Sequence, residues 1–242
     1  MYQTMIALEN KYWWFVARRS LLEQVIKKLA LPKSAEIFEA GCGTGGNLEM
    51  LARHGKVYGM ELNDTARTYA SKLQLAEIQP GCLPHNIPFP DKQFDLIVLL
   101  DVLEHIEDDA ASLQTLAAKL KPSGKLLITV PAYAWLWSKQ DEILHHKRRY
   151  RQQALVQLVR NAGYQVNLTS YFNFILFPLI AGIRLLLNLL GKGGNELVMP
   201  PKTINSMLTF LFAIERHLIT RISLPFGVSI LLLAQKNDSI NN

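Results

Sequence analysis

The stretch EIFEAGCGTGGN, Glu36 to Asn47, decides the fold that we expect for this chain. The apolar run over 36–41 predicts a buried strand, and apolar residues at helical spacing over 45–55 predict a helix. Glycines at 41, 43 and 45 permit a sharp turn between the two and let the backbone pass close under a ligand. By itself this glycine loop is a weak signal, because many strand-to-helix turns use glycine.

The residues on either side continue the alternation of strands and helices. Apolar runs predict further strands over 56–62, 76–81, 94–100, 125–131, 164–172 and 226–236, and helical spacing predicts helices over 64–74 (with Asp64 as N-cap), 108–124 and 151–163. This order predicts a doubly wound, mostly parallel seven-stranded α/β sheet with helices on both faces. We expect three parts: a helical cap over 1–34, a core over 35–173 and 225–236, and an apolar helical insertion over 174–224.

The composition narrows the class of protein without naming a function. The chain has 242 residues, of which 49% are hydrophobic and 19% charged, so a packed core is expected. Its net charge of +6 fits an anionic partner but also fits many ordinary enzymes. Two cysteines without a CxxC pair, and an N-terminus without the basic-then-apolar order of a secretory signal, favour a cytoplasmic protein.

Two acidic residues restrict the ligand of the glycine loop. Glu39 precedes the loop and would repel a phosphate, and the loop lacks the GxxxxGK[ST] pattern of a P-loop. Glu61 ends the second predicted strand about twenty residues further on, where an acidic side chain can accept hydrogen bonds from ribose hydroxyls. A ligand with a ribose and a positive charge therefore fits this edge of the sheet.

Four motifs then resemble one family. FEAGCGTGGN (38–47), GMELN (59–63), LPHNIPFPDKQFDLIVLLDVLEHIED (83–108) and LKPSGKLLITVPAY (120–133) resemble the successive motifs of class I S-adenosylmethionine-dependent methyltransferases. The resemblance covers roughly 35–170 and the last strand, and it implies a Rossmann-like fold, S-adenosyl-L-methionine as cofactor and S-adenosyl-L-homocysteine as product. The cofactor-binding residues that it implies are Glu39, Gly41, Cys42, Gly43, Glu61, Leu62, Cys82, Leu83, Asp101, Trp14 and Arg18.

Within this resemblance some roles are specific and others stay open. Cys82 stands where relatives often have an acidic residue, so adenine recognition is expected from backbone groups around Cys82 and Leu83, with His85 or Asn86 as alternatives, or Cys82 is simply a small buried residue. Asp101 is expected near the methionine part of the cofactor. His105 follows four positions later, on the same helical face, as a base, a substrate contact or a residue of the core edge.

The aromatic and basic segment over 9–29 predicts an amphipathic helix or helix pair that covers the sheet. The resemblance extends to methyltransferases in which an N-terminal helix closes over the cofactor. In such a lid Tyr12 or Trp14 would supply an aromatic wall, and Arg18 or Arg19 would pair with the cofactor carboxylate.

The cluster HHKRRY, 145–150, follows the predicted strand over 125–131 and so emerges on the ligand side of the sheet. Adjacent histidines seldom direct both rings to one ion, so no metal is expected, and the basic residues do not form the broad pattern of a nucleic-acid surface. A solvated loop at a helix start stays open as an alternative, because helix starts often carry charge. With PAY, WS and Asp141 upstream, the segment resembles a sub-group of bacterial methyltransferases. The catalytic candidates are His146 as base or substrate-orienting residue, His105, Arg149 (or Arg148) as an anion grip, and Tyr150 in the acceptor pocket.

The insertion over 174–224 is too polar near Glu215, Arg216 and Arg221 for a membrane hairpin. Its sequence is compatible with four roles: a lid over an apolar substrate, a surface that rests on the inner face of the membrane, a homodimer interface, or ordinary core. We expect a methyltransferase that acts on a small or amphiphilic acceptor, with oxygen favoured, such as a lipid-linked sugar or prenylated metabolite. The alternatives are a methyltransferase-like binding or regulatory protein without turnover, and a nucleic-acid methyltransferase.

Overall fold

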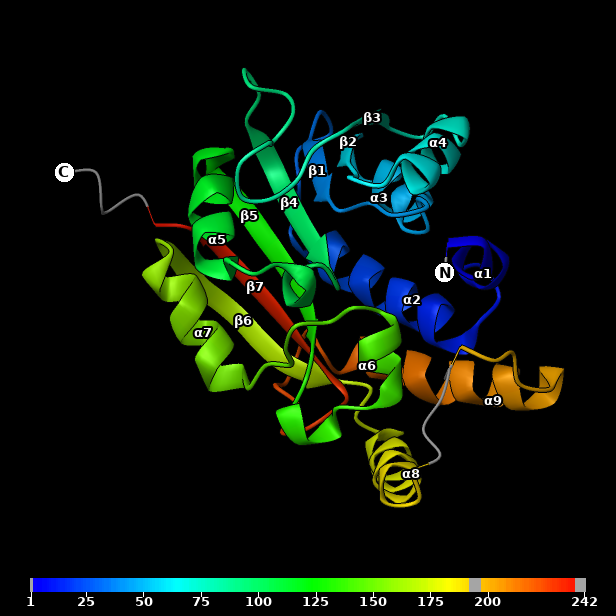
Figure 1. Ribbon diagram of the computed structural model, residues 1–242. Helices are drawn as coiled ribbons and strands as arrows, with labels where there is room; N and C mark the ends of the chain where they lie inside the picture. Colours follow the sequence, from blue (N-terminus) through cyan, green and yellow to red (C-terminus); the bar gives the residue numbers. More distant parts are fainter. Residues whose placement is uncertain (1, 192–196, 238–242) are drawn as a thin grey trace.

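A computed structural model describes residues 2–191 and 197–237 (Figure 1). Its strands are β1 (Glu36–Ala40), β2 (Lys56–Met60), β3 (Glu77–Gln79), β4 (Phe94–Leu100), β5 (Leu120–Pro131), β6 (Tyr164–Phe172) and β7 (Ser229–Lys236). They form one sheet in the order β3-β2-β1-β4-β5-β7-β6. The strand β7 runs antiparallel to β5 and β6, whereas β1, β2, β3, β4 and β5 pair in parallel. This confirms the predicted Rossmann-like, mostly parallel seven-stranded α/β fold.

Helices cover both faces of the sheet. The α-helices are α1 (Tyr2–Leu8), α2 (Trp13–Lys28), α3 (Leu48–Ala52), α4 (Asp64–Lys72), α5 (Asp109–Ala118), α6 (Lys139–Ile143), α7 (Gln152–Asn161), α8 (Phe177–Leu189) and α9 (Lys202–Ala213). The described residues also form the short 3₁₀ turns η1 (Leu103–His105), η2 (Ala134–Leu136) and η3 (Ile214–His217). In Figure 1, α2 crosses one face of the sheet with α9 beside its N-terminal part, and α5 and α7 lie on the opposite face.

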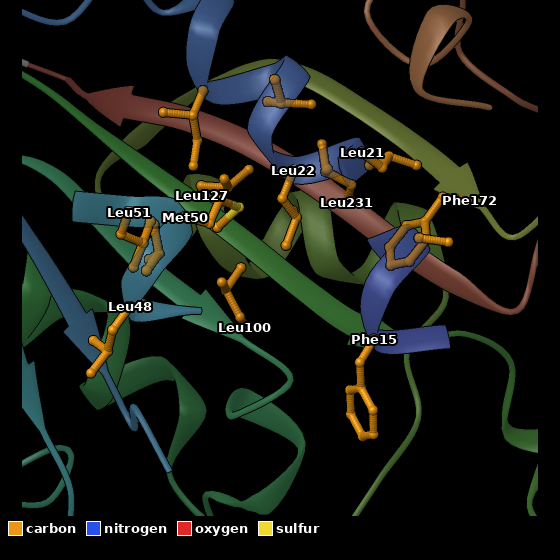
Figure 2. Packing of buried hydrophobic residues seen from close by; sticks show 14 of the residues in the cluster. Phe15, Leu21, Leu22, Leu48, Met50, Leu51, Leu100, Leu127, Phe172 and Leu231 are labelled. Atoms are coloured by element: carbon orange, nitrogen blue, oxygen red, sulfur yellow. The ribbon is translucent and has the colours of Figure 1, made fainter. Parts of the chain in front are cut away.

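The core consists of two apolar layers that the alternation of strand side chains produces. In β4, Leu96, Val98 and Leu100 point into the layer beneath α2 and α3, and Ile97 and Leu99 point into the layer beneath α5 and α7. Figure 2 shows the first layer, where Leu21 and Leu22 of α2 lie over Leu127 and Leu231 of the sheet. Burial of each such side chain stabilises the fold by roughly 1.5–3 kcal/mol. The continuous apolar run over 94–100 is therefore a strand covered on both faces, as predicted.

Three local expectations were wrong. Asn63, not Asp64, is the N-cap of α4, and its side chain accepts a hydrogen bond of 3.1 Å from the Ala66 N–H. The helix expected over 108–124 ends at Ala118, because the chain is already extended at Leu120 and pairs there with Phe94. Asp101 and His105 do not share a helical face: Asp101 has φ +59°, and η1 turns through only Leu103–His105.

The N-terminal helices and the late helices pack against each other. The Asn205 side chain accepts a 2.9 Å hydrogen bond from the Trp13 N–H and donates one of 2.8 Å to the Lys11 carbonyl. The Phe212 ring contacts Trp13 and stacks on Phe172, with ring centroids 6.1 Å apart in both pairs. In contrast, α8 buries only Ala181 and projects from the edge of the molecule in Figure 1. Among the described residues, no helix has the length and apolar character needed to cross a membrane.

Candidate active site

The carboxyl ends of β1 and β2 form a cradle around the glycine loop. Gly41 and Gly43 have φ of +84° and +54°, which side chains rarely adopt. A Cβ at Gly41 would meet the Val102 side chain at 2.8 Å, whereas one at Gly43 would point into open space. The Glu61 carboxylate accepts hydrogen bonds of 2.9 Å from the Gly43 N–H and 2.8 Å from the Asn63 N–H. Each Glu61 oxygen keeps a second lone pair for a ligand hydroxyl.

A buried polar chain links this loop to the N-terminal helices. The Asn47 amide donates to Glu39 Oε1 at 2.8 Å and accepts from Arg18 at 3.3 Å. Arg18 also forms an ion pair with Asp101, which explains why α2 closes over the end of β4. The Arg18 guanidinium carbon lies 4.7 Å from the centre of the Trp14 ring. Burial lowers the pKa of Arg18 to about 10 and raises that of Glu39 to about 7.

Two atoms of this chain fit the amino-acid end of the expected adenosylmethionine. Glu39 Oε2 and Arg18 Nε are both buried, and neither has a hydrogen-bond partner in the part of the chain that the structure describes. Buried polar atoms are normally paired, so an acceptor and a donor left open beside a glycine loop indicate a ligand with complementary groups. An ammonium would satisfy Glu39 Oε2 and a carboxylate would satisfy Arg18 Nε. The residues present therefore fit the zwitterionic end of this cofactor.

The structure also places the other residues that were expected to bind the cofactor, Leu62, Cys82 and Cys42. Leu62 follows Glu61 with its side chain 69% exposed, in position to cover a flat base. The Cys82 N–H and carbonyl are both bonded to Asn86 at 2.9 Å, so this backbone pair shapes the loop and leaves less of Cys82 to contact adenine. Cys42 is buried and packs beneath the loop, where a Cβ at Gly59 would lie 3.2 Å from its sulfur.

Sequence reasoning missed Glu9. Its carboxylate accepts a 2.6 Å hydrogen bond from the Thr44 hydroxyl, and it is 5% exposed beside Gly46. Burial raises the pKa of Glu9, as it does that of Tyr2, whose hydroxyl is also affected by the charge of Glu61. The segment around α1 thus reaches the glycine loop. A single acidic residue in an apolar segment was the only available signal, and it pointed equally to a solvent-exposed turn.

On the other side of the site, His146 is held by a buried carboxylate. Its Nδ1 lies 2.8 Å from Asp141 Oδ1, and Asp141 also accepts two hydrogen bonds from Arg149, of 2.8 and 3.0 Å. Arg149 donates a third hydrogen bond of 3.0 Å to the Ala132 carbonyl at the end of β5. Although burial acts against ionisation, His146 and Arg149 hold the pKa of Asp141 below its ordinary value. This arrangement favours a positioning role for Arg149 over the expected anion grip.

The η1 turn brings His105 and Glu104 to His146. The His105 and His146 rings meet edge to face, with centroids 4.8 Å apart. Glu104 is fully buried, and burial raises its pKa to about 8. Burial, with the neighbouring His146, lowers the pKa of His105 to about 4, so this imidazole is neutral at pH 7. Glu104 was absent from the sequence candidates because nothing in its local pattern distinguishes it from the acidic residues on either side.

The remaining candidates lie one layer further from the site. The Tyr150 hydroxyl donates a 2.8 Å hydrogen bond to Asp109, which also accepts one of 3.0 Å from Arg148. Tyr150 is 6% exposed, and burial raises its pKa above the ordinary range. Its backbone pairs with Tyr133 and Pro131 and so fixes the loop that carries His146. We therefore expect Arg148 and Tyr150 to shape the acceptor side of the site without touching the acceptor.

An aromatic group leads from this site toward α8. Tyr133 stacks on Tyr171 and on Trp135, with centroids 5.1 and 5.6 Å apart, and also contacts Phe177 at 5.8 Å. Trp135 is 47% exposed. Exposed aromatic surface next to a polar centre suits a ligand that has both an apolar and a polar part.

The strand order is that of a Rossmann-like domain. Such domains bind a nucleoside-type cofactor at the carboxyl ends of their strands, and here the glycine turn after β1 and the acidic residue after β2 lie at that edge of the sheet. Comparison of the sequence with known families narrows this class. The chain belongs to the family described as methyltransferase domain, which matches residues 14–169.

Two relatives of known family agree with this assignment. A probable S-adenosylmethionine-dependent methyltransferase of Mycolicibacterium smegmatis is 25% identical over 168 residues, which cover 68% of this chain and 64% of the relative. A ubiquinone biosynthesis O-methyltransferase of Coxiella burnetii is 34% identical over 103 residues, or 40% of this chain and 44% of the relative. The chain thus spans less than two thirds of the length of these relatives.

Solved structures share the fold. The putative methyltransferase of Haloferax volcanii, solved in complex with the methyltransferase activator Trm112, has a TM-score of 0.63 at 15% identity and covers 97% of this chain and 92% of its own. The YcgJ protein of Bacillus subtilis has a TM-score of 0.59 at 16% identity and covers 91% of this chain and 99% of its own. At these identities the likeness concerns the fold alone.

Proposed function

We propose that this protein transfers a methyl group from S-adenosylmethionine to an oxygen of a small or amphiphilic acceptor. The observation that carries the proposal is the placement of two polar centres at one edge of the sheet. The open pair of Glu39 Oε2 and Arg18 Nε fits the cofactor, and the His146 imidazole, held by Asp141 at 2.8 Å, lies beyond the end of β5 on the acceptor side.

The cofactor side of the site offers one group for each polar part of the cofactor. Glu39 would take the ammonium, Arg18 the carboxylate, and Glu61 the ribose hydroxyls, while Gly43 leaves room beneath them. The bound cofactor supplies an activated methyl group on a sulfonium. The protein aligns the acceptor with that methyl carbon and excludes water, which can account for several kcal/mol of the barrier.

The acceptor side supplies a base. Asp141 binds His146 Nδ1, which leaves Nε2 as the ring atom that faces Glu104 and His105. A hydroxyl that donates to Nε2 passes its proton there as its oxygen takes the methyl group, and Asp141 stabilises the resulting imidazolium. An amine acceptor would not need a base so positioned, and this favours oxygen as the acceptor atom.

The charge state of Glu39 predicts a pH dependence of cofactor binding. In the free protein burial raises the pKa of Glu39 to about 7, so protons occupy the carboxyl as the pH falls below 7. An ammonium ligand binds the ionised form, and the proton must leave first. The affinity for S-adenosylhomocysteine should therefore fall about tenfold between pH 7.5 and pH 6.

Calorimetric titration across this range measures the effect, with Glu39→Gln as the matched variant. Glu39→Gln should bind S-adenosylhomocysteine more weakly than the wild type at pH 7.5, and its affinity should depend much less on pH. An unchanged pH profile in Glu39→Gln would assign the titration to another group.

The insertion supports an acceptor that is presented at a membrane surface. Leu179, Ile183, Leu186 and Leu190 form an exposed apolar stripe along α8 and its end, with exposures of 55%, 48%, 56% and 53%. Within 174–191 and 197–224 the only acidic residue, Glu215, is fully buried. The stripe itself carries no acidic side chain, and Glu196 lies outside the described residues, so this surface is compatible with anionic lipid headgroups.

The late helix α9 repeats this pattern. Ile204, Met207 and Phe210 are exposed by 45%, 54% and 66%, and Lys202, Arg216 and Arg221 contribute the charged groups of this part of the insertion. We propose that the insertion 174–224, of which 192–196 lie outside the described residues, rests on the inner face of the membrane while the cap over 1–34 closes on the cofactor. The core over 35–173 and 225–236 would remain in the cytoplasm.

Transfer of a labelled methyl group tests the acceptor class. With labelled S-adenosylmethionine and anionic vesicles that contain hydroxylated amphiphiles, we expect the label in an ether of the amphiphile and one S-adenosylhomocysteine per label. Leu186→Glu should lower vesicle binding and transfer to vesicle-borne acceptors severalfold, and transfer to a water-soluble analogue should be unchanged. Gln157→Glu, which adds the same charge on an exposed position of α7, is the control.

Other outcomes distinguish the alternatives. Label in RNA or DNA, with affinity that falls steeply with salt, would indicate a nucleic-acid methyltransferase. Cofactor binding without any labelled product would indicate a regulatory protein. A concentration-dependent dimer that Leu186→Glu disrupts would assign the apolar surface to a homodimer instead of a membrane.

A further inference from the structure

Glu104 has a buried carboxyl group that lacks a hydrogen-bond partner among the described residues. It lies in η1, directly after the end of β4, and its side chain is fully buried. Neither Oε1 nor Oε2 accepts a hydrogen bond from the described residues. Arg18 and Arg149 lie near enough to influence its charge, but Arg18 is paired with Asp101 and Asn47, and Arg149 binds Asp141. A buried carboxyl group in this state can be ionised and satisfied by a cation bound beside it.

Two imidazoles face this carboxylate. His146 Nε2 lies 3.9 Å from Glu104 Oε1, which is too long for a hydrogen bond. Ligand atoms of Glu104, His105 and His146 all lie within 4.8 Å of one another. The Lys147 N–H donates a 2.8 Å hydrogen bond to the Glu104 carbonyl, so the backbones of the two segments are tied together at this point. The three side chains thus converge from two segments that are far apart in the sequence, η1 and the loop after α6.

The hydrogen bond that Asp141 makes to His146 also suits a metal ligand. Asp141 binds Nδ1, which sets the tautomer and directs the lone pair of Nε2 toward Glu104. Metal-binding histidines commonly have such a carboxylate on the second ring nitrogen, because it fixes the ring and raises the basicity of the ligand. Arg149 in turn holds Asp141 by two hydrogen bonds, so the orientation of the ring is fixed from the end of β5.

We propose that Glu104, His105 and His146 bind one divalent transition-metal cation, such as Zn²⁺ or Mn²⁺. Ligands at about 2.0–2.2 Å from a cation are roughly 3–3.5 Å apart, so the three groups need to move together by only about 1 Å. Two imidazoles and one carboxylate suit these cations better than Mg²⁺ or Ca²⁺, which prefer oxygen ligands. No metal was expected from the sequence because His145 and His146 are adjacent there, and only the fold brings Glu104 and His105 of η1 to His146.

The chemical consequence of this site rests on the proposed oxygen methylation. Three protein ligands leave positions open on the cation for an acceptor hydroxyl. A hydroxyl bound there loses its proton to solvent more readily, its oxygen forms the bond to the methyl carbon, and the electron pair of the broken S–C bond stays on sulfur. With the cation bound, His146 Nε2 is a metal ligand and no longer the base, so His146 orients and activates the acceptor through the cation. Metal binding itself requires neither the acceptor nor the cofactor, and it can be measured without turnover.

Direct metal binding tests the site. Full-length protein is stripped with EDTA, dialysed and titrated with Mn²⁺, and free Mn²⁺ is followed by electron paramagnetic resonance. We expect about one tightly bound Mn²⁺ per chain. Zn²⁺ should displace it, and Mg²⁺ at the same concentration should not. Glu104→Gln and His146→Ala should each weaken Mn²⁺ binding at least tenfold. His54→Ala, at the amino end of β2 on the opposite edge of the sheet, should bind as the wild type does.

A second measurement distinguishes the loss of a metal ligand from misfolding of the variant. Zn²⁺ should raise the melting temperature of the wild type and of His54→Ala but not that of Glu104→Gln, because a ligand of the folded state stabilises it. Retained S-adenosylhomocysteine binding shows that the Glu104→Gln site is folded. The proposal is overturned if the stripped wild type does not bind Mn²⁺, or if folded Glu104→Gln and His146→Ala bind it as tightly. Metal binding without methyl transfer would instead count against the proposed function.

Discussion

Replacement of His146 by alanine should lower methyl transfer by two to four orders of magnitude and leave the affinity for S-adenosylhomocysteine within about threefold of the wild type. The imidazole is anchored to Asp141 on the side of the site beyond β5, whereas the open cofactor-binding atoms belong to Glu39 and Arg18. Loss of the ring removes the group that activates the acceptor, whether as base or as metal ligand. Steady-state transfer and calorimetric titration of the same preparation measure the two effects.

The fold should survive this change. Asp141 keeps both hydrogen bonds from Arg149, so its carboxylate is not left unpaired. His145→Asn is the matched control: the residue is adjacent and exposed, and asparagine tolerates its φ of +59°. This variant should retain wild-type transfer. If His146→Ala instead weakens S-adenosylhomocysteine binding as strongly as it lowers transfer, His146 belongs to the cofactor side.

Replacement of Glu61 by alanine should weaken S-adenosylhomocysteine binding by two to three orders of magnitude. Hydrogen bonds to a charged group contribute about 1.5–3 kcal/mol each, and the ribose would lose two of them. The variant also deprives the Gly43 and Asn63 N–H groups of the carboxylate that accepts their hydrogen bonds at 2.9 and 2.8 Å. The glycine loop should therefore loosen as well, which adds to the loss.

The control for Glu61→Ala is Glu49→Ala. Glu49 is exposed on the neighbouring helix α3 and pairs only with Arg53 among the contacts of its side chain that the structure describes. Replacement of Glu49 by alanine changes the net charge by the same amount as Glu61→Ala, and it should leave the dissociation constant for S-adenosylhomocysteine unchanged within twofold. Transfer by Glu61→Ala should recover in part at saturating cofactor, because the acceptor side is intact. If Glu61→Ala binds S-adenosylhomocysteine with wild-type affinity, the ribose does not bind at the end of β2.

Much of the fold could be predicted because it depends on local pattern. Strand alternation, the glycine turn over 41–45 and the acidic end of β2 are each encoded within a few residues, and their order implies the sheet. The position of Glu61 at the glycine loop follows from the parallel pairing of β1 and β2, which places their carboxyl ends side by side.

The acceptor side could be predicted only in part, because it depends on contacts between distant segments. The HHKRRY cluster was correctly expected at the end of β5, but the partner of each side chain was not. Glu104 meets His146 only because β4 and β5 are neighbours, and Arg149 is bound by a carboxylate eight positions earlier in a capped turn. Charge alone could not distinguish an arginine that grips a substrate from one that holds a loop.

The central claim is that cofactor and acceptor functions occupy two separate sets of side chains at one edge of the sheet. Titration of S-adenosylhomocysteine into the wild type, Glu61→Ala and His146→Ala under identical conditions tests it most directly. The account predicts equal, tight binding by the wild type and His146→Ala, and binding at least a hundredfold weaker by Glu61→Ala. Equal affinity in all three proteins, or loss of binding in His146→Ala alone, would contradict it.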